Sequence, residues 1–435
     1  MGGSSVESTP AEKRSPEIVG LVDGHCYYVS CHRLFEPRLE GRPVVVLSNN
    51  DSAVVSRSDE AKALGVKMSQ PRSELEPLVR HHGLILRSSN YTLYQDIHQR
   101  FMRAIGSMVA GLDPYSVDEA FILLTGMNGD LSELGTSIQR HVLKAVGIPV
   151  GVGISRNRTT AKLANWASKK WKRQTKSVVA LTEYERLRKL MALAEVGDVW
   201  GIGSRLTEHL NSYGIHTALQ LADADAATMR RHHGVGLART IRELNWEYCI
   251  GPDNDGSPRK SMTCSRTFPS PTSAFSDLSS SLASFAANIG RKLRREGILA
   301  AAVRVFLQPA RASIMTSRVK SETIELLSPT NDTRVLIEVA LICLRSSYQE
   351  GVTWIRAGLM VVEAIPEQHY TPDLFAPRAR PRSRELMKAM DLINRSSGEG
   401  TIRFGAERRN LAQMIRRQYL SNRFTTSWTE LPEAT

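Results

Sequence analysis

The stretch YSVDEAF, residues 115–121, places two adjacent acids, Asp118 and Glu119, at the start of an apolar run. A second apolar run, IVGLV at residues 18–22, ends directly at Asp23. Strand ends can bring these three carboxylates to one sheet edge only if something cancels their repulsion, and two divalent cations would do so. Mg²⁺ prefers oxygen ligands and the set contains no His or Cys, so the pattern indicates a phosphoryl-transfer site with two Mg²⁺ ions. The alternative is an ordinary solvated Asp-Glu turn.

The composition indicates an intracellular protein of several domains. The chain has 435 residues, of which 41% are hydrophobic and 23% charged, enough for more than one buried core. It contains no run of about 18 apolar residues, and its first residues lack the apolar core of a signal peptide. We therefore expect a soluble, cytoplasmic protein with a short disordered leader at residues 1–15. The five cysteines show no CxxC spacing, which favours reduced thiols and no structural zinc.

The charge makes nucleic acid the first partner to consider. Lys and Arg together number 57 against 44 Asp and Glu, which gives a formal net charge of +13. Much of the excess is Arg, whose guanidinium suits bidentate contact with phosphate. A membrane surface would attract the same charge, so the composition alone leaves both partners open.

Up to about residue 180, apolar runs of strand length alternate with amphipathic runs of helix length, which is typical of an α/β or α+β domain. The turn Asn49-Asn50-Asp51 between two apolar runs predicts a hairpin. Strands are expected at residues 18–22, 44–47, 53–56, 84–87, 115–116, 121–124 and 149–154, and helices at 27–35, 59–64, 91–110, 131–146 and 159–170.

The rest of the chain divides at a linker. Residues 182–245 show a helical pattern with short glycine breaks, and a Gly/Pro/Asp-rich stretch follows. The next elements are in the order strand, helix, strand, strand, helix, strand, the βαββαβ pattern of a split βαβ or ferredoxin-like unit. They are expected at residues 261–268, 277–296, 299–308, 316–327, 332–347 and 355–362, with a further helix at 383–394.

Aromatic and basic residues near the acids suggest a nucleotide site. Tyr27 and Tyr28 open a helix just after the first acid, where a ring can rest on a sugar, although aromatic residues there normally fill a core. Two strand-to-helix junctions also carry cations able to receive a triphosphate. The first junction holds Ser56, Arg57 and Lys62, and the second holds Arg158 and Lys162.

Two further features point to DNA contact. The turn Gly201-Ile202-Gly203 is similar to a helix-hairpin-helix element, whose glycines let backbone amides approach a phosphate; the alternative is an ordinary capping turn. A basic helix end could also contact DNA, although such a run is usually a solvated face. Its residues are Arg291, Lys292, Arg294 and Arg295.

Several segments resemble, in family order, those of the Y-family DNA polymerases, and most closely the UmuC type, the catalytic subunit of bacterial DNA polymerase V. They are DGHCYYVSC, GRPVVVLSNNDSAVVSRSDEAKALGVKM, SSNYTLYQD, YSVDEAF, GVGISRNRTTAKLAN and VWGIG. The resemblance spans residues 18–425 and implies an α+β fold with right-handed polymerase architecture. The expected parts are a ferredoxin-like palm at 16–35 and 85–181, small fingers at 36–84, a helical thumb at 182–250, a linker at 251–260, a little finger at 261–365 and a C-terminal tail at 366–435.

The resemblance assigns catalytic residues as well. It implies that Asp23, Asp118 and Glu119 hold two Mg²⁺ ions, with the Gly24 carbonyl as an added ligand. It also implies that Tyr28 is a steric gate that excludes the 2′-hydroxyl of ribonucleotides.

The implied triphosphate contacts fall near Ser56, Lys62 and Lys162. Asp59 departs from the pattern, because many relatives in other Y-family branches carry a phosphate-binding Tyr there. An ionised acid cannot donate a hydrogen bond to phosphate, so this contact is not expected here, and Arg57 is a possible substitute.

The implied activity is template-directed addition of deoxynucleotides to a primer 3′ end by two-metal phosphoryl transfer. The small, helix-poor fingers that the resemblance implies leave an open site, which admits damaged templates. The implied role is therefore error-prone translesion synthesis in the bacterial DNA-damage (SOS) response, at the nucleoid. A catalytically silent DNA-damage scaffold would keep the same folds. A metal-dependent nuclease or other phosphotransferase would use the same acids.

The implied partners are primer-template DNA, deoxynucleoside triphosphates, a processed UmuD-type accessory subunit, a RecA-type recombinase filament and a sliding clamp, with no membrane. Clamp binding is expected in QHYTPDLF at residues 368–375, through Leu374 and Phe375. The alternative is a plain tail with a buried Phe.

Overall fold

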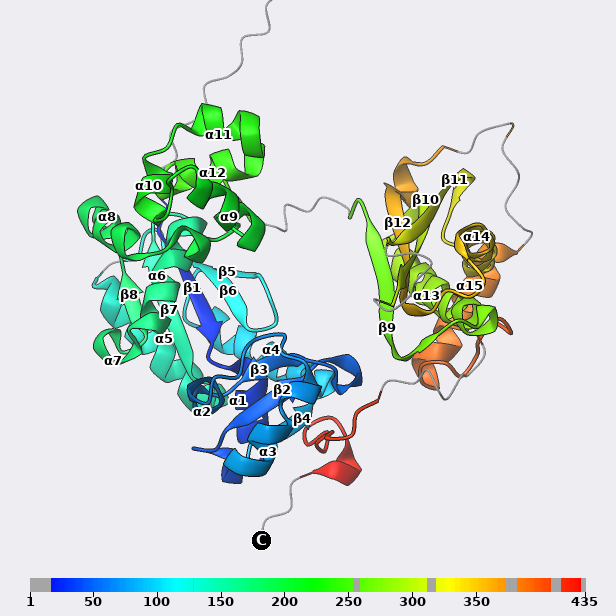
Figure 1. Ribbon diagram of the computed structural model, residues 1–435, viewed down its shortest axis with the longest axis horizontal. Helices are drawn as coiled ribbons and strands as arrows, with labels where there is room; N and C mark the ends of the chain where they lie inside the picture. Colours follow the sequence, from blue (N-terminus) through cyan, green and yellow to red (C-terminus); the bar gives the residue numbers. More distant parts are fainter. Residues whose placement is uncertain are drawn as a thin grey trace, which may run out of the picture. The chain divides into compact units, whose positions relative to one another are not determined.

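The computed structural model describes residues 17–127, 129–252, 259–310, 318–371, 375, 382–407 and 416–431. The chain divides into two compact units, residues 1–255 together with 418–435, and residues 256–417 (Figure 1). The expected leader lies outside the described residues, as does most of the expected linker. Within the described ranges, no helix is long and apolar enough to cross a membrane.

The first unit is built on a five-stranded sheet whose central strand is the apolar run that ends at Asp23. This strand, β1 (Val19–Gly24), pairs antiparallel with β6 (Glu119–Leu123) and with β7 (Val150–Ser155). Every residue of β1 and β7 is buried, as expected for strands covered on both faces. The edge strands are β5 (Gly111–Pro114), beside β6, and β8 (Val178–Ala180), beside β7.

Helices cover both faces of this sheet. The helices α4 (Tyr91–Gly106) and α5 (Leu131–Val146) pack on one face, and α6 (Arg158–Lys170) packs on the other. The close approach of α6 requires glycine at position 153 of β7, because a Cβ there would lie 2.1 Å from the backbone nitrogen of Asn165. This contact holds α6 directly over the strands that carry the acids.

A second, three-stranded sheet has β2 (Val44–Leu47) at its centre. It pairs antiparallel with β3 (Val54–Arg57) and parallel with β4 (Ile85–Ser88). The predicted hairpin is confirmed: Asn50 and Asp51 have φ angles of 63° and 51°, a conformation that Asn and Asp tolerate. The short helices of this region are α1 (Tyr27–Arg33), α2 (Asp59–Ala63) and α3 (Glu76–His82).

Residues 418–431, expected as part of a tail, pack on this region. The Ser88 N–H donates to the Tyr419 carbonyl at 3.0 Å, and the Tyr419 N–H donates to Ser88 Oγ at 3.0 Å. Phe424 is only 7% exposed, and its ring stacks on Phe35 with centroids 4.8 Å apart. Phe424 therefore belongs to the core of the first unit.

Short helices follow, as expected for residues 182–245. They pack around one apolar core that contains the fully buried Leu187, Leu210 and Leu221. The helices are α8 (Tyr184–Leu193), α9 (Ser204–Ser212), α10 (Ala218–Ala222), α11 (Ala226–His233) and α12 (Val235–Leu244).

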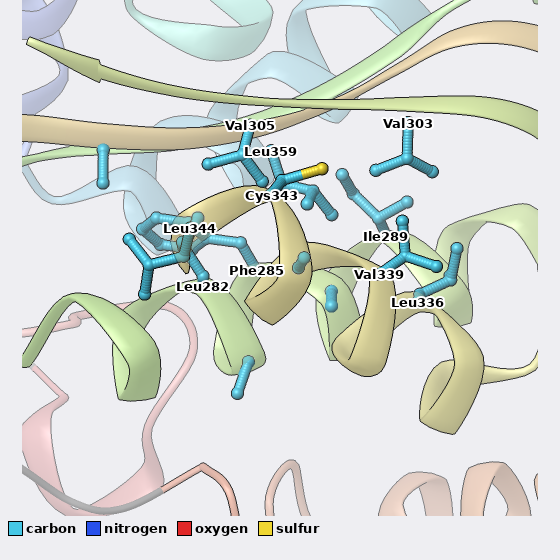
Figure 2. Close-up of a cluster of buried hydrophobic side chains, with 14 of the residues drawn as sticks. Leu282, Phe285, Ile289, Val303, Val305, Leu336, Val339, Cys343, Leu344 and Leu359 are labelled. Atoms are coloured by element: carbon cyan, nitrogen blue, oxygen red, sulfur yellow. The ribbon is translucent and has the colours of Figure 1, made fainter. Parts of the chain in front are cut away.

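The second unit has the expected βαββαβ order. Its strands form an antiparallel sheet in the order β11 (Lys320–Thr330), β10 (Ile298–Pro309), β12 (Trp354–Pro366) and β9 (Met262–Thr272). A strand of each βαβ half therefore lies between the strands of the other half. Figure 2 shows helix residues such as Phe285 and Leu336 facing Val305 and Leu359 of the sheet. The elements are β9 (Met262–Thr272), α13 (Phe275–Glu296), β10 (Ile298–Pro309), β11 (Lys320–Thr330), α14 (Thr333–Ser347) and β12 (Trp354–Pro366), followed by α15 (Ser383–Ser396).

The expected strand at residues 115–116 is wrong. Tyr115 and Ser116 form a tight turn, in which both N–H groups donate to the Glu119 carbonyl at 3.0 Å, and the strand lies earlier, at β5. The elements β8, α3 and α7 (Lys172–Thr175) were not expected. Elements this short carry too few residues to show a period.

Candidate active site

The three acids come together at one end of the five-stranded sheet. Asp23 of β1 lies opposite Glu119, the first residue of β6, in the strand register. Asp118 directly precedes β6, and its carbonyl accepts from the Gly24 N–H at 2.8 Å. Asp23 is 5% exposed, so its charge lies away from bulk water. Pairing of the two strands thus places all three acids in one neighbourhood.

Two lysines on one face of α6 contact these acids. Lys162 Nζ lies 3.0 Å from Glu119 Oε2, and Lys169 Nζ lies 2.5 Å from Asp23 Oδ2. The two lysines are about two helical turns apart, so both point to the same side of α6. Lys162 was expected near the site, whereas Lys169 was missed, although its spacing from Lys162 was a usable signal.

The pKa values of the acids reflect their burial. Loss of water raises the pKa of Asp23 to about 8; Lys169 acts against this shift, and Glu119 adds to it. Burial also raises the pKa of Asp118. Burial acts in the same direction on Glu119, but the hydrogen bond with Asp23 and the charge of Lys162 together lower its pKa. The carboxyls of Asp23 and Glu119 therefore differ in proton affinity and share a hydrogen bond.

Divalent cations fit this group of donors. The acids supply only carboxylate oxygens, which Mg²⁺ prefers. Added positive charge would also stabilise the ionised forms of Asp23 and Asp118, whose pKa values are raised by burial. Glycine at position 24 leaves room for the Tyr27 ring, because a Cβ there would lie 2.9 Å from Tyr27 Cδ2. The oxygens do not form one tight shell: within the described part of the chain, the one group with ligand atoms all within 4.8 Å is His25, Cys26 and Asp59.

The two adjacent tyrosines differ in their surroundings. Tyr27 is 3% exposed and its hydroxyl donates to the Tyr94 carbonyl at 3.0 Å, which favours the core role. Tyr28 is only half-buried, and its ring stacks on Tyr94 at 4.2 Å with an interplanar angle of 11°. Tyr91 meets the Tyr28 ring edge-on at 6.4 Å. Tyr28 is thus a supported ring with one part accessible.

The first predicted phosphate junction is only partly built as expected. Ser56 is buried in β3, and Arg57 donates to the Val66 carbonyl, which gives this arginine a local structural partner. Lys62 contacts Asp59 Oδ1 at 2.8 Å. A further cation, Lys172 of α7, lies 3.2 Å from Asp59 Oδ2 and was not predicted.

The predicted Gly-Ile-Gly turn joins a short 3₁₀ helix to α9. Gly201 has φ +88°, a conformation that favours glycine, while Gly203 is exposed at the N-terminus of α9. Ile202 is 8% exposed and anchors the turn in the helical core. Trp200, just before the turn, meets Tyr115 edge-on at 5.7 Å. The turn is therefore fixed to the sheet that carries the acids.

The basic helix end of α13 is divided between two environments. Arg294 makes two hydrogen bonds to Asp391 of α15, at 2.7 and 2.8 Å, and Arg291 lies 3.0 Å from Glu399. Half of the predicted DNA-contacting run is therefore engaged within the second unit. The exposed members are Lys292 and Arg295.

The face of the four-stranded sheet opposite α13 and α14 also carries cations. Arg304 donates to Thr323 Oγ1 at 2.8 Å, and Arg356 donates to Ser265 Oγ at 2.8 Å; both arginines are exposed. Arg356 also lies 5.8 Å from the ring centre of Phe306. Neighbouring side chains on the strands hold these two guanidinium groups along the open face.

The predicted clamp peptide is described only in part. Leu374 lies outside the described residues. Phe375 is 92% exposed, so the alternative of a tail with a buried Phe is not supported at this position.

Comparison with known families gives three successive matches. Residues 22–166 match the impB/mucB/samB family, and residues 259–374 match the C-terminal domain of the same family. Residues 384–434, expected only as part of a tail, match a domain of unknown function.

Named relatives cover nearly the whole chain. Protein UmuC of Salmonella typhimurium is 38% identical over 420 residues, which cover 95% of this chain and 99% of the relative. Protein ImpB of the same organism is 37% identical, with 96% and 99% covered. DNA polymerase IV 2 of Bacillus subtilis is 25% identical, with 89% and 93% covered.

Solved structures show the same fold. A Y-family DNA polymerase chimera matches with a TM-score of 0.64 at 19% identity, covering 79% of this chain and 98% of that one. DinB from Sulfolobus solfataricus matches with a TM-score of 0.51 at 20% identity, covering 80% and 99%. The expected fold and family are thereby confirmed: this chain belongs to the impB/mucB/samB family and has the α+β fold of the Y-family DNA polymerases.

Proposed function

We propose that this protein is an error-prone translesion DNA polymerase that extends a primer 3′ end in the bacterial DNA-damage response. The observation that carries the proposal is the meeting of Asp23, Asp118 and Glu119 at one sheet end beneath the cations of α6. Family membership supports the same activity, since relatives over most of the chain include a protein named as a DNA polymerase.

The acids are the residues that would hold two Mg²⁺ ions, together with the carbonyl of Gly24. When bound, the ions lower the pKa of the primer 3′-hydroxyl and neutralise charge on the leaving pyrophosphate. The reaction joins the primer 3′ oxygen to the α-phosphorus and breaks the bond from that phosphorus to the pyrophosphate oxygen. Lys162, which lies 3.0 Å from Glu119, would move to a phosphate oxygen, and Lys62 of the first junction would do the same.

Tyr28 is the sugar gate in this proposal. Its ring is held from below by Tyr94 and from one edge by Tyr91, so it cannot shift far without disturbing packed aromatic neighbours. A 2′-hydrogen fits over such a fixed ring, whereas a 2′-hydroxyl collides with it.

The parts of the chain divide the remaining tasks. The palm (16–35 and 85–181) carries the acids, and the fingers (36–84) receive the triphosphate. The thumb (182–250) would approach a DNA phosphate through the amides of the Gly201–Gly203 turn. The little finger (261–365) would bind the duplex with the open sheet face that presents Arg304 and Arg356, and its exposed helix cations Lys292 and Arg295 add to the general attraction for DNA.

Further partners belong to the same proposal. A processed UmuD-type accessory subunit and a RecA-type filament would act with the polymerase at the nucleoid, and a sliding clamp would bind around Leu374 and Phe375. The exposure of Phe375 supports the clamp contact, because a docking side chain must be accessible.

Primer extension tests the proposal directly. The full chain, Mg²⁺ and all four deoxynucleotides are supplied with a primer annealed to a template that carries an abasic site, with and without the accessory subunit and filament. We expect extension past the lesion, and none with Asp118→Ala. Shortening of the labelled primer would indicate a nuclease instead. No reaction under any condition, with DNA binding intact, would indicate a silent scaffold.

A further inference from the structure

One acid of the first unit contacts two exposed lysines. Asp59, the first residue of α2, lies 2.8 Å from Lys62 Nζ through Oδ1 and 3.2 Å from Lys172 Nζ through Oδ2. His25 Nε2 lies 3.5 Å from Oδ2. The side chains of Asp59, Lys62 and Lys172 are 52%, 40% and 49% exposed, so a ligand from solution can reach all three.

This cluster adjoins the catalytic acids. His25 follows Asp23 by two positions on the chain. Lys172 follows Lys169 by three positions, and Lys169 itself contacts Asp23 at 2.5 Å. A triphosphate whose α-phosphorus lies at the acids would extend its outer phosphates into this surrounding group of cations.

Contacts within the cluster determine the ionisation state of Asp59. Partial burial opposes ionisation of Asp59, but the hydrogen bond and charge of Lys62, followed by His25 and Lys172, hold the pKa of Asp59 well below its usual value. One carboxylate therefore faces two ammonium groups, and the pair of lysines keeps an excess of positive charge.

A metal site is the competing interpretation. Ligand atoms of His25, Cys26 and Asp59 all lie within 4.8 Å of one another. However, Lys62 Nζ also lies 3.2 Å from Cys26 Sγ, and Lys172 contacts the same carboxylate. Two ammonium groups touch the atoms that a cation would need and would repel it. The cluster is therefore suited to an anion.

We propose that Asp59 competes with the triphosphate. Its carboxylate binds Lys62 and Lys172 until the outer phosphates of a nucleotide displace it. The identity of the displacing anion as a nucleotide rests on the proposed polymerase function, whereas the competition itself does not. Asp59 thus sets how tightly the phosphates bind. Because it touches only the phosphate subsite, it weakens binding of all four deoxynucleotides alike and does not touch the reacting atoms.

Binding of inorganic tripolyphosphate tests this without requiring any catalysis. We expect Asp59→Asn to tighten tripolyphosphate binding by about fivefold at low salt, the size of one exposed ion pair removed from competition. Glu60→Gln is the matched control, because Glu60 is the next residue of α2 but contacts Arg33, at 2.9 Å, and not the lysines. Unchanged or weaker binding by Asp59→Asn overturns the proposal, as does an equal gain in the control.

A double-mutant cycle shows whether the gain acts through the lysines. In a Lys172→Gln background, Asp59→Asn should lose part of its effect, because one of the two contested ammonium groups is gone while Lys62 remains. A gain that persists in full places the effect elsewhere. Thermal unfolding of each variant separates this from a merely structural role, which would lower the melting temperature without improving binding.

Nucleotide incorporation then connects the competition to the proposed function. Asp59→Asn should lower KM for each deoxynucleotide by a similar factor of about five and leave kcat unchanged. A changed kcat with the same KM contradicts the proposal. If the wild-type chain extends no primer while tripolyphosphate binding responds as expected, the polymerase function fails and the competition stands.

Discussion

The two larger sheets of this protein use charge in opposite ways. The five-stranded sheet is covered on both faces, and the acids that we propose as catalytic lie at strand ends, where Asp23 is 5% exposed. The four-stranded sheet is covered on one face, and the other presents Arg304 and Arg356 to solvent. Enclosure shifts the pKa of an acid and prepares it for metal chemistry, whereas an open, regular face suits a repeating polyanion. Catalytic charge thus needs burial, and binding charge needs access.

The largest expected effect removes an enclosed charge. Asp118→Ala should reduce primer extension by about a thousandfold or more, because metal-held charge stabilises mainly the transition state. DNA binding should change little, since the open face is intact. Glu133→Ala, an exposed acid of α5, is the control and should extend normally. Extension by Asp118→Ala near the wild-type rate, measured with Mg²⁺ present, would contradict a catalytic role for this acid.

The two units should also respond separately to loss of core packing. Phe424→Ala removes a ring that is 7% exposed and stacked on Phe35, and should destabilise the first unit by about 3 kcal/mol. Calorimetry should show the transition of the first unit shifted to lower temperature and that of the second unit unchanged. A shift of both transitions would mean that the units unfold together.

The pH dependence of stability follows from the enclosed acids. The folded-state pKa of Asp23 is raised to about 8 from 3.8, so its protonated form is favoured in the folded chain. The favourable contribution of Asp23 to the free energy of unfolding is present below about pH 4 and is lost as pH rises through about 8. Without divalent ions, wild-type stability should fall relative to Asp23→Asn across this window, as followed by chemical denaturation. Parallel curves would show that the charge of Asp23 is not disfavoured.

The gate prediction concerns one ring at the margin of the enclosed site. Tyr28→Ala should raise ribonucleotide incorporation relative to deoxynucleotide incorporation by about tenfold or more, since roughly 1.4 kcal/mol of discrimination already gives that ratio. Tyr28→Phe keeps the ring and should keep the wild-type selectivity. Competitive incorporation on one template measures both. A folded, active Tyr28→Ala with unchanged selectivity would place the gate elsewhere.

The smallest expected effect concerns the open face. Arg304→Ala and Arg356→Ala should each weaken duplex binding severalfold and reduce the slope of log affinity against log salt by about one. Arg294→Ala should leave this slope unchanged, because Arg294 is engaged with Asp391. An equal reduction of the slope by Arg294→Ala would indicate that DNA binds on the helix side of the second unit.

Local patterns were enough to predict most of the framework. The apolar run before Asp23, the Asn50 hairpin and the βαββαβ order are encoded over a few neighbouring residues, so each can be recognised without knowing the fold. Asp118 and Glu119 could be placed near Asp23 because strand ends of one sheet converge. The acid pair therefore needed no tertiary information beyond the prediction of two strands.

Only the tertiary structure decided which distant residues meet. Asp391 engages Arg294 across 97 positions of sequence, and Ser88 pairs with Tyr419 across 331. Lys172 meets Asp59 across 113 positions and comes from a helix of four residues, too short to carry a pattern. Periodicity states which face of an element is buried, but the partner on that face depends on the path of the whole chain. For this reason the sequence alone predicted the acids, the strands that hold them and the nearby Lys62 and Lys162, whereas folding showed that Lys169 and Lys172 join them.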